Sequence, residues 1–304
     1  MKEALALRGI ALRAPGISSW AQAIEVFQGQ STLEPSPLSN PTGTGLPPAE
    51  RRRATWITRL ALDVAREALS DQPLCEPTSI FASSGGEVDI VNQMFTQLAS
   101  EDRRLSPTAF HNSVHNAAAG HFSIASGSMA PAESLCAFDE SFGTGLMEVL
   151  LRAQNGEDHL LLVAYDAPPP FPLSEVRPIR YPFALALYFA KGSARPLATL
   201  TGRYAPGHPQ TRPLDLPFLN QLAQDNPAAK SLPLLSCIAR QEDRTLEIAA
   251  GLGGHLKLAG IPRPLALHPA RFKSRWSGSP LKPKEQFTRF AFRPKKAWRS
   301  KGGL

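Results

Sequence analysis

The run HLLLVAYDAPPP, residues 159–170, constrains the fold of this chain more than any other segment. It is continuously apolar from Leu160 to Tyr165 and then ends in an acidic residue and three prolines. A strand with one face in water alternates apolar and polar residues, whereas an uninterrupted apolar strand is buried on both faces. We therefore expect a layered α/β architecture in which helices cover a sheet.

Other segments support the same architecture by alternating between strand and helix patterns. Residues 4–12 and 181–191 predict strands, and residues 78–100 predict a buried strand, a small-residue turn and a helix. Residues 47–71 predict one helix that begins with proline. Residues 244–260 hold two apolar runs around a Gly-Gly pair, which predicts a β-hairpin.

The net charge of +7 is concentrated at the end of the chain. Residues 263–304 contain twelve Lys or Arg and one acid, whereas residues 1–262 contain 21 basic and 25 acidic residues, a net charge of −4. We predict a folded domain over residues 5–262 and a disordered basic tail rich in Pro, Gly and Ser. Nucleic-acid binding through the tail is an alternative that we do not favour, because no recognised nucleic-acid module accompanies the charge.

The composition argues against several other classes of protein. Three widely spaced cysteines, Cys75, Cys136 and Cys237, give neither a disulfide framework nor a zinc motif, and the seven histidines lack zinc-site spacing. We therefore expect no metal and no other cofactor. No apolar run reaches the length of a membrane span, and charged residues interrupt the N-terminal segment. A cytoplasmic protein is the resulting expectation.

Three stretches together resemble a known family. They are FHNSVHNAAAGHFSIASG (110–127), SLCAFDESFGTGLMEVLLRAQNG (134–156) and LLLVAYDAPPP (160–170). They resemble the N-terminal half of β-ketoacyl synthases, and more narrowly the shortened, chain-length-factor-like ketosynthase subunits of bacterial aryl-polyene pathways. The resemblance covers roughly residues 5–260. It implies an α/β, thiolase-like layered fold that matches mainly the N-terminal half of a ketosynthase.

The resemblance also implies where a nucleophile would lie. An active ketosynthase carries its acyl chain as a thioester on a cysteine at a strand-to-helix turn, and two histidines from the second half of the fold assist. Aligned without gaps from Gly156, the family pattern places Asp139 at the nucleophile position and Cys136 almost a helical turn earlier. An aspartate cannot form a thioester, so we expect Asp139 to cap the helix through its side chain, a role that Ser141 also suits. The two histidine motifs are not visible after residue 190.

These features predict a non-catalytic subunit that pairs with an active ketosynthase in fatty-acid or polyketide-type biosynthesis, including aryl-polyene biosynthesis. Acyl carrier protein is the second expected partner. The resemblance implies six residues at the acyl tunnel or the subunit interface: His111, Asn112, His115, Asn116, Phe138 and Phe142. The alternative is an acyl-condensing enzyme that uses Cys136 as nucleophile with a histidine from residues 111–121, such as His115.

Each of these residues also has a purely structural interpretation. A free cysteine in apolar surroundings is more often a small buried hydrophobe than a nucleophile, and we favour that reading for Cys136. We favour hydrogen bonding between helix and loop for the histidines of residues 111–121. Gly85 and Gly86 predict a tight turn, because the sequence lacks the remaining residues of a phosphate-binding loop. Asp166 follows a strand, where it either serves a functional site or caps the next turn.

Overall fold

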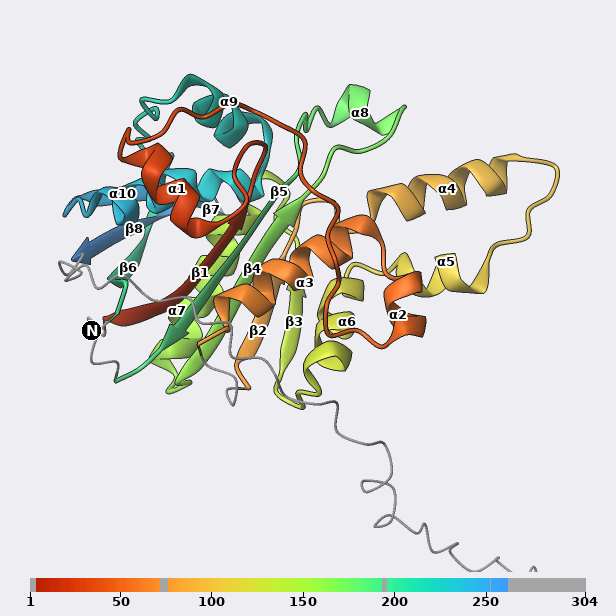
Figure 1. Cartoon of the computed structure of the whole chain (residues 1–304), viewed down its shortest axis with the longest axis horizontal. Coiled ribbons are helices and arrows are strands. Elements are labelled where there is room, and N and C mark those ends of the chain that lie inside the picture. Colours follow the sequence, from red (N-terminus) through yellow and green to blue (C-terminus); the bar gives the residue numbers. More distant parts are fainter. Residues whose placement is uncertain (1–3, 72–75, 193–195, 252, 262–304) are drawn as a thin grey trace, which may run out of the picture. The chain divides into compact units, whose positions relative to one another are not determined.

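A computed structural model describes residues 4–71, 76–192, 196–251 and 253–261 of the protein. Within these residues, eight strands form one sheet in the order β3-β2-β4-β5-β1-β6-β8-β7 (Figure 1). The strand β2 pairs in parallel with β3 and β4, and the other pairings are antiparallel. The strands are β1 (Leu5–Arg13), β2 (Thr78–Ala82), β3 (Ala132–Leu135), β4 (His159–Asp166), β5 (Phe183–Ala190), β6 (Ala198–Pro206), β7 (Thr245–Ala250) and β8 (Gly254–Ile261).

Helices cover both faces of this sheet, and each face has its own apolar core. One core contains α1 (Trp20–Phe27), α7 (Ser141–Gln154), α9 (Pro217–Asp225) and α10 (Leu232–Arg240). The other contains α3 (Trp56–Ala68) and α6 (Ala117–Ser126). The short helices are α2 (Pro48–Arg53), α5 (Pro107–Asn112) and α8 (Leu173–Val176), with 3₁₀ turns η1 (Phe138–Glu140) and η2 (Ala228–Ser231). The layered α/β expectation is confirmed.

The central strand β4 explains why both faces need cover. From Leu160 to Asp166 every residue is buried, as the uninterrupted apolar run predicts. Its neighbour β5 is buried along its whole length as well. The side chains of these strands alternate between the two cores, so Leu162 belongs to one core and Val163 to the other.

The predicted helix over residues 47–71 is wrong in one respect, because it is two helices. α2 ends at Arg53, Ala54 is extended, and α3 begins at Trp56. Thr55 is the physical reason: its side chain accepts a hydrogen bond from the Thr58 N–H at 3.1 Å, which starts a new helix. The break leaves Arg51, Arg52 and Arg53 exposed while α3 packs its apolar face on the sheet.

The hairpin predicted over residues 244–260 is confirmed by β7 and β8, which continue the sheet beyond β6. Sequence patterns did not identify β6, α9 or α10. On the other side of the fold, α4 (Val88–Ala99) has no buried residue and projects from the sheet together with α5 (Figure 1). The basic tail and Cys75 lie outside the described residues.

Candidate functional site

Three loops meet where the parallel strands end. The strands β3, β2 and β4 finish at Leu135, Ala82 and Asp166, and parallel strands bring their carboxyl ends to one edge of a sheet. The Ser83 N–H donates to the Leu135 carbonyl at 3.1 Å and so joins the first two ends. We call this region the strand-end site; it comprises the turns 83–87 and 136–141, Asp166, and the segment 167–180.

Asp166 organises the turn after β2 rather than its own following turn. Its Oδ1 accepts hydrogen bonds from the Ser83 hydroxyl at 3.0 Å, the Ser84 N–H at 2.8 Å and the Gly85 N–H at 3.3 Å. Its Oδ2 is buried and has no hydrogen-bond partner among the described residues. Complete burial raises the pKa of this carboxyl from 3.8 to about 7, because the loss of hydration outweighs the three hydrogen bonds and the nearby Arg177 cation.

The turn itself is tight, as the Gly85-Gly86 pair predicts. Gly86 has a φ of +57°, and a Cβ there would lie 3.1 Å from Cδ2 of His115. The Gly86 N–H donates to the Ser83 hydroxyl oxygen at 2.8 Å. His115 Nε2 lies 3.0 Å from the Ser83 carbonyl oxygen, so this histidine has the structural hydrogen-bonding role that the sequence favours.

Arg177 connects the loops that follow β2, β3 and β4. Its guanidinium contacts Asp139 Oδ1 at 2.6 Å and Ser84 Oγ at 2.5 Å. Its Cζ also lies 3.8 Å from the centre of the Phe138 ring, the geometry of a cation–π contact. Sequence reasoning missed this residue, since nothing in its neighbourhood marks it as functional.

The expected helix cap by Asp139 is wrong. Glu140 occupies the N-cap position of α7, no side chain of the described residues caps the helix there, and the Asp139 carboxylate pairs with Arg177 instead. Ser141 does not cap the helix either, because its hydroxyl accepts from the Ala137 N–H at 3.0 Å and donates to the Phe138 carbonyl at 2.8 Å. The left-handed backbone of this turn belongs to Phe138, with a φ of 52°, one position before Asp139.

Cys136 is exposed, which corrects the expectation of a buried thiol. Its Sγ donates to the Ser84 carbonyl oxygen at 3.3 Å. In the part of the chain that the structure describes, no histidine nitrogen or carboxylate oxygen lies within hydrogen-bond distance of this thiol. A cysteine nucleophile needs a base or another group that favours the thiolate, and the hydrogen bond to a carbonyl does not supply one.

Of the remaining predicted site residues, three are exposed and two are buried. His111, Asn116 and Phe138 are exposed. Asn112 is buried and donates to the Arg53 carbonyl at 2.8 Å, and Phe142 is fully buried in the core beneath α7. Both side chains are buried within this chain and support its fold. Their role at the acyl tunnel or the subunit interface stays a prediction.

The described residues bring together no group of three or more metal-ligating side chains. Among the same residues, no helix has both the length and the apolar composition that crossing a membrane requires.

The sequence matches the family model described as "Beta-ketoacyl synthase, N-terminal domain" over residues 20–249. The chain belongs to this family. No curated protein matches the sequence.

Solved structures of ketosynthase complexes share the fold. A chain of the "Ketosynthase (ApeO) in Complex with its Chain Length Factor (ApeC) from Xenorhabdus doucetiae" superposes with a TM-score of 0.65 and 22% identity, over 84% of this chain and 99% of that one. A chain of "The ishigamide ketosynthase/chain length factor" gives a TM-score of 0.66 at 12% identity, over 86% and 100% of the two chains. A third match is a type II polyketide synthase ketosynthase with its acyl-carrier protein (AntDE:AntF), with a TM-score of 0.60 at 12% identity, over 86% and 100%.

In this ketosynthase-family chain, the turn before α7 is held by side chains from distant segments. Ser84 and Arg177 were not identified from the sequence, although the small residues of ASSGG after a buried strand marked the turn that Ser84 occupies. A charged residue in a proline-containing loop carries no comparable signal, because such residues are most often solvated.

We expect the Arg177–Asp139 pair to contribute modestly to stability. Asp139 is about half exposed, so solvent screens the pair, and its coupling free energy should be about 0.5–1 kcal/mol. A double-mutant cycle with Arg177→Gln and Asp139→Asn, followed by urea unfolding, measures this coupling. Additive effects of the two substitutions would show that Arg177 acts through Ser84 and Phe138 alone.

Proposed function

We propose that this chain is a non-catalytic, chain-length-factor-like subunit that pairs with an active ketosynthase in fatty-acid or polyketide-type biosynthesis, including aryl-polyene biosynthesis. The observation that carries the proposal is the turn before α7. There Phe138 and Asp139 are held by Arg177, and none of the described residues places a base beside the nearby Cys136 thiol. A subunit with such a turn provides binding surface in a complex and does not itself carry the acyl chain as a thioester.

The side of the fold around α4, α5, α6 and the edge strand β3 suits a partner. An edge strand has unpaired backbone groups that can pair with another chain. α6 contacts β3, and α4 contacts α5. Large apolar side chains are exposed on α4 (Phe95 and Leu98), on α5 (Phe110) and on α6 (Ile124). Large exposed apolar patches on a protein surface often mark protein–protein interfaces. We call these four side chains the α4–α6 surface.

The matched structures support a ketosynthase as the partner, because they are complexes that contain ketosynthases and chain length factors. One of them also contains an acyl-carrier protein, which supports the same class of third component here.

The test is co-expression of this chain with a tagged ketosynthase from the same genome, followed by purification and single-turnover assays with malonyl-loaded acyl-carrier protein. We expect a stable complex whose condensation activity is lost on mutation of the partner's cysteine and unchanged by Cys136→Ala. A chain that stays monomeric in the presence of the ketosynthase would overturn the proposal.

An active condensing enzyme is the second candidate, favoured by the exposure of Cys136. Intact-mass analysis after incubation with acyl-loaded carrier protein separates the two functions. An acyl adduct that disappears with Cys136→Ala, together with condensation by this chain alone, would establish the enzyme.

The α4–α6 surface provides a direct prediction. Changing Phe95 and Phe110 together to serine should weaken ketosynthase binding at least tenfold, because each aromatic ring would lose apolar contact area in the complex. The free energy of unfolding should change by less than about 0.5 kcal/mol, since both rings are more than 60% exposed. Leu151→Ser, an exposed apolar residue of α7 outside both this surface and the strand-end site, is the control. Equal affinities of all three proteins, measured by calorimetry, would exclude this surface.

A further inference from the structure

A cavity beside α3 shares no residue with the strand-end site or the α4–α6 surface. This cavity of about 600 Å³ is bounded by the end of β1, the start of α1, helix α3 and the loop 36–44. We call it the α3 pocket. Its volume is in the range of sites that hold a small organic molecule.

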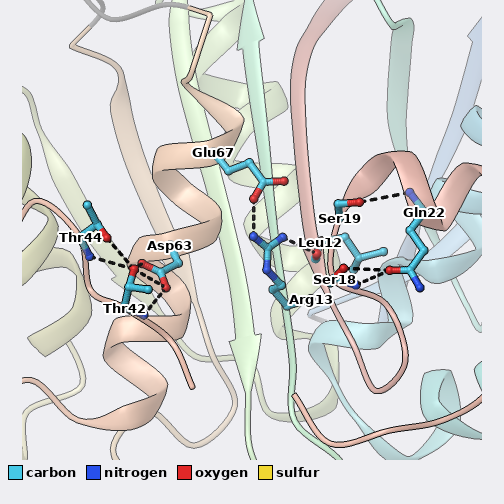
Figure 2. Close-up of polar contacts among 9 residues, drawn as sticks. All are labelled: Leu12, Arg13, Ser18, Ser19, Gln22, Thr42, Thr44, Asp63 and Glu67. Carbon is cyan, nitrogen blue, oxygen red and sulfur yellow. Dashed lines mark hydrogen bonds and ion pairs between the residues drawn. The ribbon is translucent and has the colours of Figure 1, made fainter. Parts of the chain in front are cut away.

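The loop over the pocket is fastened at two points. At one end the Gly16 N–H donates to the Ser36 carbonyl at 3.0 Å. At the other end Thr42 binds Asp63 through its backbone N–H at 2.6 Å and its hydroxyl at 2.9 Å, as Figure 2 shows. Between these anchors, residues 37–41 make no hydrogen bond to any described residue. The side chains of Ser39 and Asn40 therefore keep their hydrogen-bonding capacity for a ligand.

The acidic side chains of the pocket already have partners. Both carboxylate oxygens of Asp63 accept from Thr42, and Glu67 forms an ion pair with Arg13 (Figure 2). Gln22 is also engaged: it accepts from the Ser18 N–H at 2.9 Å and donates to the Gly16 carbonyl at 2.8 Å. These contacts fix the walls of the pocket: Arg13 neutralises Glu67, and the Thr42 N–H and hydroxyl satisfy the carboxylate oxygens of Asp63.

Arg66 also lines the pocket, and its side chain takes no part in the contacts described above. Its side chain forms no ion pair or hydrogen bond with the described residues, yet its guanidinium lies beside Gly45. Gly45 has a φ of +101°, and a Cβ at this position would lie 2.3 Å from Arg66 Nη1. The glycine thus leaves the space that the guanidinium occupies beside the pocket.

We propose that the α3 pocket binds a small hydroxylated molecule with a carboxylate or phosphate group, and that Arg66 binds this anionic group. Guanidinium N–H groups match the oxygen pairs of carboxylates and phosphates, and such charge-assisted hydrogen bonds are stronger than neutral ones. Ser39 and Asn40 supply hydrogen bonds to the hydroxyl groups. This site is independent of the partner function, because its residues lie outside both the strand-end site and the α4–α6 surface.

Calorimetric titration of the full chain at low, constant ionic strength tests the proposal. Citrate, glucose 6-phosphate and inorganic phosphate are the anionic probes, and glucose is the uncharged control. We expect saturable binding of citrate or glucose 6-phosphate at millimolar or lower concentration, with glucose and inorganic phosphate at least tenfold weaker. Comparing the affinities of citrate and glucose 6-phosphate distinguishes a preference for carboxylates from a preference for phosphates.

Arg66→Gln should weaken the preferred probe at least tenfold, because it removes the charge and keeps hydrogen-bonding capacity. Arg52→Gln, an exposed arginine of α2 outside the pocket, is the matched control and should bind like the unchanged protein. Asn40→Ala should weaken the same probe without changing the unfolding midpoint, since its side chain has no partner in the described structure. Equal binding by the Arg66 and Arg52 variants, or no saturable binding of any anionic probe, would overturn the proposal.

Discussion

Replacing Asp166 by asparagine is expected to remove most of the dependence of stability on pH between about pH 4 and pH 7. The carboxyl is fully buried, and its pKa is about 7 in the folded protein against an ordinary value of 3.8. Over this interval the folded state holds a proton that the unfolded state has released. Asparagine is uncharged at every pH, and its amide oxygen can accept the same three hydrogen bonds.

The sign follows from proton linkage. Because the folded state binds more protons than the unfolded state between these two pKa values, the free energy of unfolding falls as pH rises, by up to about 1.4 kcal/mol per pH unit. The loss is complete above about pH 7, where the carboxylate is charged in both states. Relative to the unchanged protein, the asparagine variant should therefore gain stability as pH rises through this interval.

Urea unfolding of both proteins at half-unit steps from pH 4 to pH 8 measures this difference. A smaller slope should remain in the variant, because burial also raises the pKa values of Glu87 and Asp89. Asp166→Ala is the companion variant. It leaves the Ser83 hydroxyl and the Ser84 and Gly85 N–H groups without their acceptor, at a cost of about 3 kcal/mol. Parallel pH profiles for the unchanged protein and the asparagine variant would contradict the assigned pKa.

Local patterns were sufficient for several strands of the sheet. The apolar run of β4 required cover on both faces, and the Gly-Gly pair between two apolar runs defined the β7–β8 hairpin. In both cases the deciding information lies within a dozen residues of sequence. The segment between β5 and β7 lacked such a signal, because the strand β6 is partly exposed over much of its length.

The strand-end site depended on contacts that no local pattern contains. The resemblance directed attention to the turn before α7, but Asp139 was expected to interact with its own helix and instead pairs with Arg177 from the loop after β4. Asp166 likewise binds the turn after β2 rather than the residues that follow it. Such pairings depend on which strands are neighbours in the sheet. Family membership supplies that order, and the composition of single segments does not.

A close approach of the backbone explains why α7 contains a glycine at position 143, and it leads to the second large effect. A Cβ at Gly143 would lie 1.9 Å from the Ala249 carbonyl oxygen of β7, and that oxygen belongs to the main chain and cannot rotate away. Gly143→Ala should therefore separate α7 from β7 and lower the free energy of unfolding by about 3 kcal/mol or more. The higher helix propensity of alanine offsets only about 1 kcal/mol of this loss.

Gly120 in α6 is the matched control, because a Cβ there meets nothing within 4 Å. Gly120→Ala should raise the free energy of unfolding by about 0.5–1 kcal/mol, since the unfolded chain loses backbone freedom and the folded helix gains no clash. Urea unfolding of both variants at one pH compares the effects directly. The opposite signs follow from one difference, the presence or absence of main-chain atoms opposite the glycine. Two stabilising substitutions would mean that α7 and β7 are farther apart than the structure places them.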